Sequence, residues 1–354
     1  MIRISAASAA VQAAMSVLQT MLRQPALSHQ RDLMSTVAAS DHLRLIKHLR
    51  ELTGSPISDV KACLAAANWD LAQAHEALRL KGVEAAAKKS TRHAAEGLVG
   101  LYSANPHLAV AVEVNSETDF VARNALFQAL VQRVTQAAAA LLPSSAHHSG
   151  SMQGEGAGCS AGPAVQELDV EQLLAQPLPG SGHTVAEEVA ATVAVVRENI
   201  RVRRAYRLAS STGCLGTYLH QSAAPGLGRI AALVLLESST PGPEPLASVP
   251  AVGELSSQLA MHVAGMRPSC IQHTAAQQAG GVGLTGPTAS ADRAGQQDME
   301  REGEGEAALL DQPFLLDPAL SVRLVLQRQA ERGGSPLHVA AFLRLQCGEG
   351  LQQL

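Results

Sequence analysis

Apolar residues recur three and four positions apart in three successive runs between residues 41 and 84, and this spacing predicts three amphipathic helices. Turn-forming residues separate the runs, with Thr53-Gly54-Ser55-Pro56 after the first and Asn68-Trp69 after the second. Asp70 is a suitable N-cap for the third helix, and Gly82 is expected to end it. The apolar positions of the three runs are Leu45, Ile46, Leu49 and Leu52, then Val60, Cys63, Leu64 and Ala67, and finally Leu71, Ala74 and Leu78.

Three short helices joined by tight turns indicate a compact bundle over residues 41–84, similar to ubiquitin-associated (UBA) domains. The chain then continues through Glu84–Lys89, which is rich in Ala and basic and is expected to be a helix or a linker.

After the bundle the apolar spacing changes from helical to alternating. Leu98–Tyr102 and Leu108–Val114 have the pattern of strands, and the short polar run between them predicts a hairpin. Asn115–Phe120 interrupts the second strand, and a long helix is expected after it. These elements form the first part of a core, over residues 95–141. One face of the long helix is expected to carry Leu126, Leu130 and Val134.

The second part of the core is predicted over residues 165–354, where helical and strand patterns follow one another. The fold class is therefore α+β, with a three-helix UBA-like bundle followed by a two-part core of antiparallel sheets flanked by helices. Two segments have the composition of spacers: a Ser-, Gly- and Ala-rich linker at 142–164, and a low-complexity insert at 274–307 that is expected to be disordered. The predicted elements are a helix ending near Asn199, strands at Val202–Ala209, Leu215–His220 and Ile230–Leu236, helices at Leu255–Val263 and Pro318–Arg328, and a last strand at Ala340–Cys347.

Charge and composition exclude several kinds of function. The chain has 27 Lys and Arg against 31 Asp and Glu, a net charge of −4, so direct nucleic-acid binding through clustered cations is not expected. Aromatic residues make up 2% of the chain, which argues against stacking platforms for bases. No apolar stretch approaches the roughly 20 residues that cross a bilayer, so no membrane association is expected.

No motif indicates catalysis, a metal or a cofactor. The five cysteines are odd in number and far apart, and no histidine lies at metal-ligand spacing from them. Gly281–Gly286 fits the G-x-G-x-x-G pattern, but no strand precedes it, so we expect a linker there and no nucleotide bound to the chain itself. Cys63 lies on a predicted buried helical face, which makes it a poor nucleophile.

The first 31 residues contain three arginines and no acidic residue. Apolar residues between Val11 and Leu22 are spaced to lie on one helical face. Such a leader is typical of organellar transit peptides, and we expect one over residues 1–38. The alternative is an N-terminal helix that stays on the mature protein.

Short motifs follow one another through residues 43–350, apart from the two spacers, and together they resemble the elongation factor Ts family. Each motif is weak alone, but they stand in the order that the family has. The motifs are Leu45–Asp59 with Val60-Lys61, Ala65–Asp70, Ala85–Lys89, Glu113–Ala122, Arg197–Arg204, Tyr218-Leu219-His220, Leu259–Ala264 and Gln312-Pro313-Phe314.

The resemblance implies a guanine-nucleotide exchange factor that binds elongation factor Tu of an organelle and speeds GDP release, without covalent catalysis. Asp119 and Phe120 come directly after a buried strand and before a helix, so the scaffold fixes their direction while the turn exposes them. They are expected to act as a wedge near the magnesium and phosphate ligands of the partner. The partner contacts implied by the family are Asp119, Phe120, Thr118, Val121, His220, Lys61, Lys88, Lys89 and Val196.

The residues alone leave other roles open. Asp119 could be the N-cap of the following helix, and Phe120 a staple that packs on it. The lysines could be a solvated face, His220 the edge of a strand, and Val196 part of the core. The chain departs from the family pattern at Ala62, where many members have a second Lys, at Trp69, which replaces a small turn residue, and at Arg197, which replaces a Gly.

Two rival functions remain at this stage. The bundle would suit a UBA-type adaptor that binds ubiquitin, although this leaves the downstream residues unexplained. An enzyme with an unrecognised site in residues 182–350 would require converging polar groups, and none is visible there. No S1-type RNA-binding modules flank the core as in the plastid fusion form of the family, so the mitochondrial matrix is the expected location, with the plastid as the alternative.

Overall fold

The computed structural model describes residues 41–141, 158–160, 165–180, 182–240, 245–272, 307–333 and 336–351. The expected transit peptide, the G-x-G-x-x-G segment and nearly all of the expected insert lie outside these residues. The chain divides into two compact units, the first ending at Lys81 and the second beginning at Gly82.

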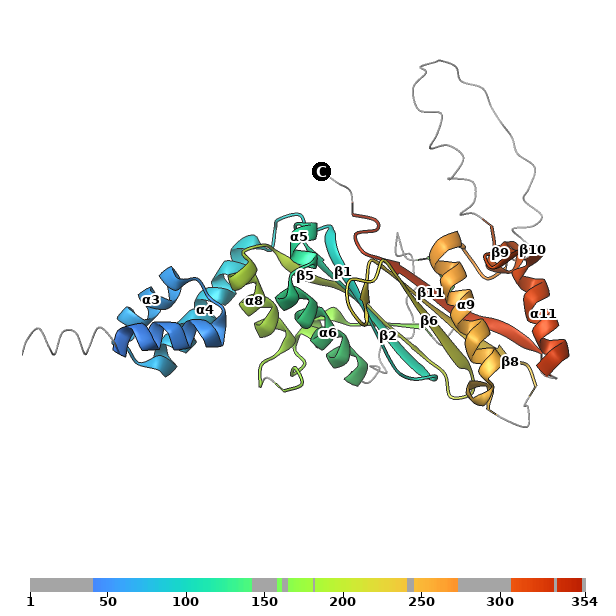
Figure 1. Ribbon diagram of the computed structural model, residues 1–354, viewed down its shortest axis with the longest axis horizontal. Coiled ribbons are helices and arrows are strands. Elements are labelled where there is room, and N and C mark those ends of the chain that lie inside the picture. Colours follow the sequence, from blue (N-terminus) through green and yellow to red (C-terminus); the bar gives the residue numbers. More distant parts are fainter. Residues whose placement is uncertain are drawn as a thin grey trace, which may run out of the picture. The chain divides into compact units, whose positions relative to one another are not determined.

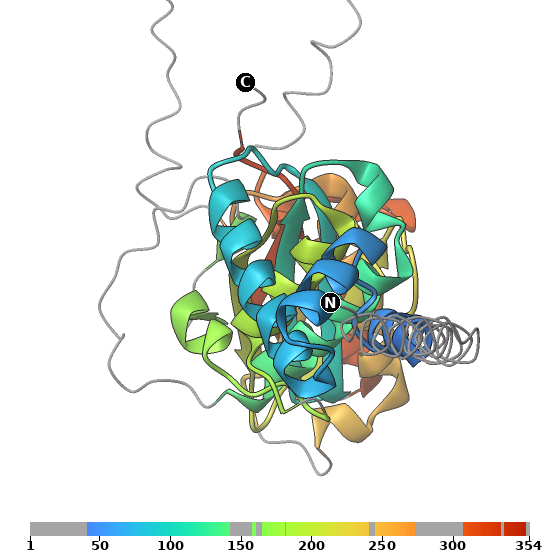
Figure 2. The same ribbon diagram turned by 90° about the vertical axis from the view of Figure 1, so that its left-hand side faces the viewer.

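The first unit consists of helices around one small core (Figure 2). Residues 41–53 are helical, and α3 (Ile57–Ala66) and the first part of α4 (Leu71–Lys89) follow. Asn68 and Trp69 make the turn between α3 and α4 with positive φ angles of 49° and 66°. The side chain of Asp70 accepts a hydrogen bond from the Gln73 N–H at 2.9 Å, which confirms its capping role. The buried residues of this core are Leu49, Val60, Cys63, Leu64, Ala74 and Leu78.

The expectation that Gly82 ends the third helix is wrong, because α4 continues to Lys89. Gly82 is buried, and a Cβ there would lie 3.4 Å from the Ala194 Cβ and 3.5 Å from the Ala190 carbonyl oxygen. The glycine therefore permits a close approach to a neighbouring helix instead of ending its own.

The described residues of the second unit form two large antiparallel sheets and a two-stranded hairpin. The first has the strand order β4-β5-β2-β1-β7, and β1 and β2 form the expected hairpin. The second has the order β3-β11-β8-β6. The strands of the first sheet are β1 (Glu96–Asn105), β2 (Leu108–Ser116), β4 (Val165–Leu168), β5 (Ile200–Ala209) and β7 (Leu227–Gly228). Those of the second are β3 (Gly158–Ser160), β6 (Cys214–His220), β8 (Ile230–Ser238) and β11 (Leu337–Gln346).

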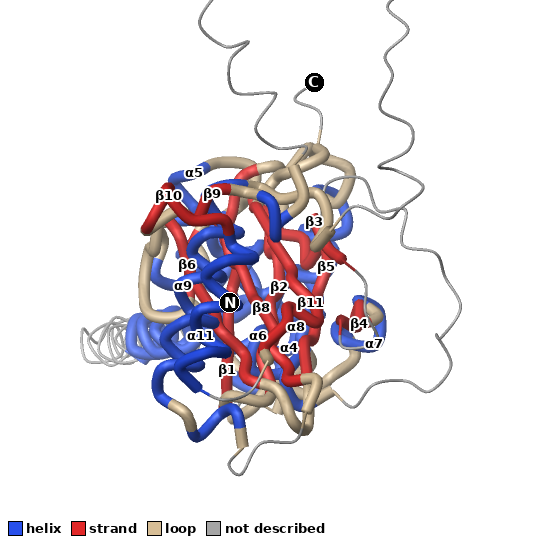
Figure 3. Tube along the Cα trace, turned by 90° about the vertical axis from the view of Figure 1, so that its right-hand side faces the viewer, coloured by secondary structure: helices blue, strands red, loops and turns tan. Residues whose placement is uncertain are grey.

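The two sheets pack face to face, and helices cover their outer faces (Figures 1 and 3). Between the sheets lie Ala111 and Tyr206 of the first and Leu233 and Leu343 of the second, all buried. The helices on the first sheet are α5 (Asp119–Ala122), α6 (Ala125–Ala140), α7 (Val170–Leu174) and α8 (Val185–Val196). Those on the second are α9 (Pro250–Met266) and α11 (Val322–Gly333), together with η1 (Leu246–Ser248), η3 (Leu309–Asp311) and the hairpin of β9 (Pro313–Phe314) and β10 (Asp317–Ser321).

Three details of the core differ from the sequence expectations. The helix expected from Pro318 begins at Val322, because Asp317–Ser321 pairs with β9 as β10. Leu126 is 51% exposed, whereas Leu130 and Val134 are buried as expected. Residues 158–160, within the expected linker, form β3 on the edge of β11. In the first case pairing with the neighbouring β9, and in the third case pairing with the distant β11, overrides the local pattern.

A buried carboxylate joins the two sheets. Glu113 of β2 is 0% exposed, and its oxygens accept hydrogen bonds from Arg203 at 3.1 Å, from Arg204, and from the Gly348 N–H at 2.8 Å. Asn115 donates to the same carboxylate at 3.0 Å. Arg204 also donates to the carbonyl oxygen of Gln346 at the end of β11, at 3.1 Å. The buried charge therefore has donors from β2, from β5 and from the turn after β11.

Replacing Glu113 by Ala is expected to lower the free energy of unfolding by about 3–5 kcal/mol, because it leaves the buried guanidinium group of Arg204 and the half-buried one of Arg203 without their acceptor. Urea unfolding followed by circular dichroism measures this. The matched control is Glu167→Ala on β4, an exposed strand residue, which is expected to change stability by about 0.5 kcal/mol or less. Equal effects of the two substitutions would contradict the role assigned to Glu113.

Candidate partner-binding site

The chain turns sharply between β2 and α5, at residues 117–120, which we call the corner. Phe120 is 77% exposed, the largest fraction among the exposed large apolar residues of the described chain. The next residue, Val121, is buried at 7% in the core of the first sheet. Thus α5 is anchored on one side by Val121 and presents Phe120 to solvent on the other. The staple interpretation of Phe120 does not fit this exposure.

Asp119 is the first helical residue of α5, and Thr118 occupies the N-cap position, so Asp119 is not the cap. Its carboxylate pairs with Arg123 one turn later, at 2.8 Å. The Arg123 side chain is exposed and that of Asp119 is about half exposed, so the pair adds little stability and the carboxylate stays accessible. The corner therefore offers an aromatic ring and a carboxylate side by side.

The loop after α8 lies against the corner. Glu198 accepts two hydrogen bonds from Thr118, from its N–H at 2.9 Å and from its hydroxyl at 2.8 Å. In return, Glu117 accepts a hydrogen bond from the Asn199 N–H at 2.6 Å. The side chain of Asn199 donates to the Arg92 carbonyl oxygen at 2.8 Å, at the turn that follows α4. Two of the sequence motifs, Glu113–Ala122 and Arg197–Arg204, thus meet at this point.

A hollow of about 480 Å³ lies beside the corner. Asp119 lines it, and so does Gln221, which directly follows His220 at the exposed end of β6. The structure therefore places the connection after β6 next to the Asp119 side of the corner. The hollow is lined by Glu96, Leu98, Asp119, Ala122, Arg123, Gln221, Ala223 and Arg229, with Glu96 and Arg229 forming an ion pair.

The remaining expected contact residues have different surroundings. Val196 is the last residue of α8, half-buried against the core of the first sheet and two residues before Glu198. Lys88 is exposed and Lys89 half-buried in the last turn of α4. Lys61 is exposed on α3 of the first unit. Val121 is buried, so it supports the corner from below.

Sequence reasoning assigned no role to Glu198, Asn199 or Gln221. The first two stand in a quoted motif, but nothing in their spacing points to Thr118, which is 80 residues from Glu198. Gln221 follows a predicted strand and has a positive φ of 51°, a turn geometry that the local sequence did not indicate.

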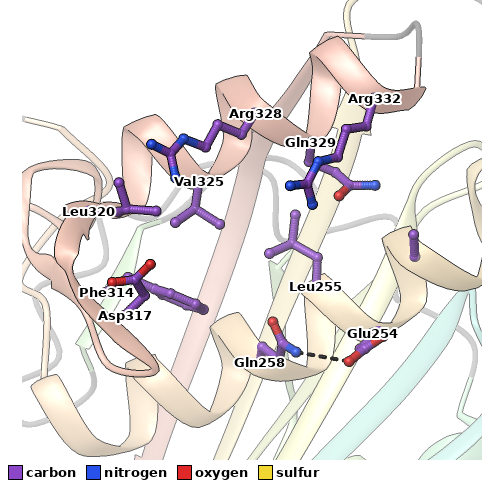
Figure 4. A pocket seen from close by; sticks show the side chains of 11 residues that line it. Glu254, Leu255, Gln258, Phe314, Asp317, Leu320, Val325, Arg328, Gln329 and Arg332 are labelled. Atoms are coloured by element: carbon purple, nitrogen blue, oxygen red, sulfur yellow. Dashed lines mark hydrogen bonds between the residues drawn. The ribbon is translucent and has the colours of Figure 1, made fainter.

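A second hollow, of about 400 Å³, lies between α9 and α11 (Figure 4). Its walls carry both signs of charge, with Arg328 and Arg332 on α11, Glu254 on α9 and Asp317 on β10. None of the expected contact residues lines it. Within the described residues, no group of His, Cys, Asp and Glu could hold a metal ion, and no helix is long and apolar enough to span a membrane.

Comparison with known proteins gives one consistent result. A family model described as Elongation factor TS matches residues 117–279. Elongation factor Ts of Rhodospirillum centenum is 36% identical over 319 residues, covering 87% of this chain and 93% of that protein. The mitochondrial elongation factor Ts of Arabidopsis thaliana is 35% identical over 328 residues, covering 90% of this chain and 80% of that protein. The mitochondrial elongation factor Ts of Chlamydomonas reinhardtii is 35% identical over 344 residues, covering 90% of this chain and 83% of that protein.

The fold and the exposed corner define an α+β protein that presents an aromatic ring and a carboxylate to solvent between β2 and α6. The extent of the matches makes the relationship specific: the chain belongs to the elongation factor Ts family. The relatives cover the core as well as the N-terminal helices, which a UBA-type adaptor would not explain.

Arg197 ends α8 in the left-handed region, with φ 65° and ψ 16°, and its N–H bonds to the Val193 carbonyl oxygen at 2.9 Å. This backbone favours glycine, and its exposed side chain makes no hydrogen bond or ion pair among the described interactions. Arg197→Gly is therefore expected to raise the free energy of unfolding by about 0.5–1 kcal/mol.

The control for this prediction is Arg201→Gly, an exposed residue of β5 without a positive φ. There glycine is expected to lower the free energy of unfolding by about 0.5–1 kcal/mol. Urea unfolding measures the change in the free energy of unfolding for both variants, which is expected to be positive for Arg197→Gly and negative for Arg201→Gly. A loss of stability in Arg197→Gly would refute the backbone explanation.

Proposed function

We propose that this protein is a guanine-nucleotide exchange factor for an elongation factor Tu. It binds the GDP form of that partner and promotes GDP release so that GTP can rebind, with Asp119 and Phe120 as the wedge. The observation that supports this most is the 77% exposure of Phe120 on a corner that is hydrogen-bonded to the loop after α8, through the Thr118 N–H and through the Glu117 carboxylate.

Phe120 supplies the binding energy of the wedge. A rigid exposed aromatic ring loses little conformational freedom when it enters a pocket of a partner, and such anchors contribute most of the energy of many interfaces. Burial of the neighbouring Val121 anchors the backbone that carries the ring to the core of the first sheet.

Asp119 supplies charge at the same place. A carboxylate brought near the magnesium ion and phosphates of a bound nucleotide competes for the metal and repels the phosphate charge. By linkage, if this chain binds the nucleotide-free partner more tightly than the GDP form, GDP weakens the binding of this chain by the same factor. No covalent step, cofactor or nucleotide of the chain's own is part of the proposal.

Further contacts extend the proposed interface. Thr118 and His220 border the wedge, Val121 and Val196 support it, and Lys88 and Lys89 add positive charge at the end of α4. The first unit, proposed to be a UBA-like domain, contributes Lys61. The proposed division of the chain is a transit peptide at 1–38, the UBA-like domain at 41–84, core subdomains at 95–141 and 165–354, a linker at 142–164 and an insert at 274–307.

The exchange assay tests this proposal. The full chain is expected to accelerate release of the fluorescent nucleotide mant-GDP from organellar elongation factor Tu. Phe120→Ala is expected to lower the accelerated rate at least about tenfold, equivalent to about 1.4 kcal/mol of lost interaction, while the protein stays folded. Absence of any acceleration by the unsubstituted chain would remove the proposed function.

The matched control is Leu324→Ala on α11, an apolar residue that is 44% exposed and does not line the hollow beside the corner. It is expected to leave the exchange rate unchanged. Lys61→Ala, on the first unit, is expected to weaken exchange less than Phe120→Ala. If Phe120→Ala and Leu324→Ala behave alike, the wedge assignment is wrong.

The proposed location is the mitochondrial matrix, with the plastid as the alternative, and the proposed partner is the elongation factor Tu of that organelle. The acid-poor, amphipathic composition of the leader and the mitochondrial names of the plant and algal relatives support it. A fluorescent reporter fused to residues 1–40 is expected to enter mitochondria in plant cells. Import into plastids would select the alternative, and a cytosolic reporter would contradict both.

A further inference from the structure

We infer that Glu198 is a positioning residue for exchange: together with Glu117 it fixes the direction of the corner, and it acts on the partner only through Phe120 and Asp119. This inference rests on the proposed function. We call the two carboxylates, with Thr118 and Asn199, the carboxylate clamp.

The corner cannot fix its own direction. The helix α5 has four residues, and a single turn is not stable by itself because ordering it costs more entropy than its few hydrogen bonds recover. Thr118 occupies the N-cap position, where a threonine hydroxyl commonly accepts a hydrogen bond from the helix, yet it makes no such bond. Its hydroxyl donates to Glu198 instead. The residue that would cap the turn is thus used to fasten it to a distant loop.

The clamp is reciprocal, and each carboxylate binds the backbone of the other loop. Glu198 receives the Thr118 N–H at 2.9 Å, and Glu117 receives the Asn199 N–H at 2.6 Å. Hydrogen bonds to an ionised acceptor are stronger than those between neutral groups. Glu117 is also 3.4 Å from the Arg92 guanidinium, which ties the turn after α4 to the same point.

The backbone after α8 brings Glu198 to this position. Arg197 adopts the left-handed conformation that reverses the chain directly after the helix, and Glu198 is the next residue. The clamp bonds join residues 80 and 82 positions apart, so they define where the end of β2 lies relative to the start of β5. Both strands pair directly, with Ser116 opposite Ile200.

The clamp touches neither the ring of Phe120 nor the carboxylate of Asp119. Its loss leaves the apolar core and the strand pairing intact, so the unit stays folded while the corner gains freedom. If the corner has to become ordered on binding, the conformational entropy lost in that step weakens the interaction with the partner. Removal of the clamp therefore slows exchange, and it does so only while Phe120 is present to be positioned.

A double-mutant cycle separates positioning from general structural support. Glu198→Ala is expected to slow mant-GDP release from elongation factor Tu about tenfold, and the same change in a Phe120→Ala background about twofold or less. Glu198→Gln can still accept from the Thr118 N–H and donate to its hydroxyl, so it is expected to restore most of the rate. Equal effects of Glu198→Ala with and without Phe120 would overturn the inference.

The matched control is Glu171→Ala, an exposed glutamate in the first turn of α7, which is expected to leave the rate unchanged. Glu198→Ala with an unchanged exchange rate would reject the positioning role even if the unsubstituted chain is active.

A measurement without the partner distinguishes the inference from the proposed function. Amide hydrogen exchange of the full chain is expected to show protection at Thr118 and Asn199. In Glu198→Ala the protection of Thr118 is lost, whereas that of the β2 amides remains. A Thr118 amide that exchanges freely in the unsubstituted protein overturns the clamp, whether or not the chain accelerates GDP release.

Discussion

The second unit depends on one buried charge, the carboxylate of Glu113, which has no access to solvent and must find all its hydrogen bonds inside the protein. Its donors come from β2, from β5 and from the turn after β11, so its hydrogen bonds connect the end of the second sheet to the first. Cys347, which lies near Glu113, is also buried. Its burial, and secondly the negative charge of Glu113, raise the pKa of its thiol to about 12. This thiol stays protonated and inert at physiological pH.

The buried Glu113 also helps to fix the position of the exposed corner, because both belong to the same stretch of chain. Glu113 lies three residues before the end of β2, and the carboxylate clamp begins directly after that strand. Hydrogen bonds therefore hold β2 at Glu113, inside the unit, and the carboxylate clamp holds the chain again directly after the strand ends. Phe120 therefore lies between hydrogen-bonded residues on one side and the buried Val121 on the other, although three quarters of its own surface is in water. The other phenylalanines, Phe127, Phe314 and Phe342, are buried, so exposure of this one has no explanation in the packing of the chain itself.

Local patterns in the sequence predicted those elements that carry their own periodicity. The hairpin of β1 and β2, the helices α6 and α9, and the strands β5, β6 and β8 follow the expected positions within a few residues. Two of the failures share one cause: β3 and the passage of α4 through Gly82 depend on a partner strand or helix that lies far along the chain, whereas β10 pairs with the nearby β9. The same limit applies to the site. A change from strand to helix pattern predicted an exposed turn at Phe120, but the bonds of Glu198 to Thr118 join distant residues and leave no local signal.

Burial separates the family motifs into scaffold and contact surface. His262, in the Leu259–Ala264 motif, is 0% exposed and bonds to the Gln312 side chain at 2.9 Å, while its other nitrogen accepts from the Leu315 N–H at 3.1 Å. An accepting nitrogen requires the neutral ring, in agreement with burial, which lowers the pKa of His262. This motif is therefore internal, as are Gln312 and Phe314 of the Gln312-Pro313-Phe314 motif, so the resemblance at these residues reflects the shared fold. Motifs with exposed members, among them Phe120 and His220, are the ones that we propose for recognition of the partner.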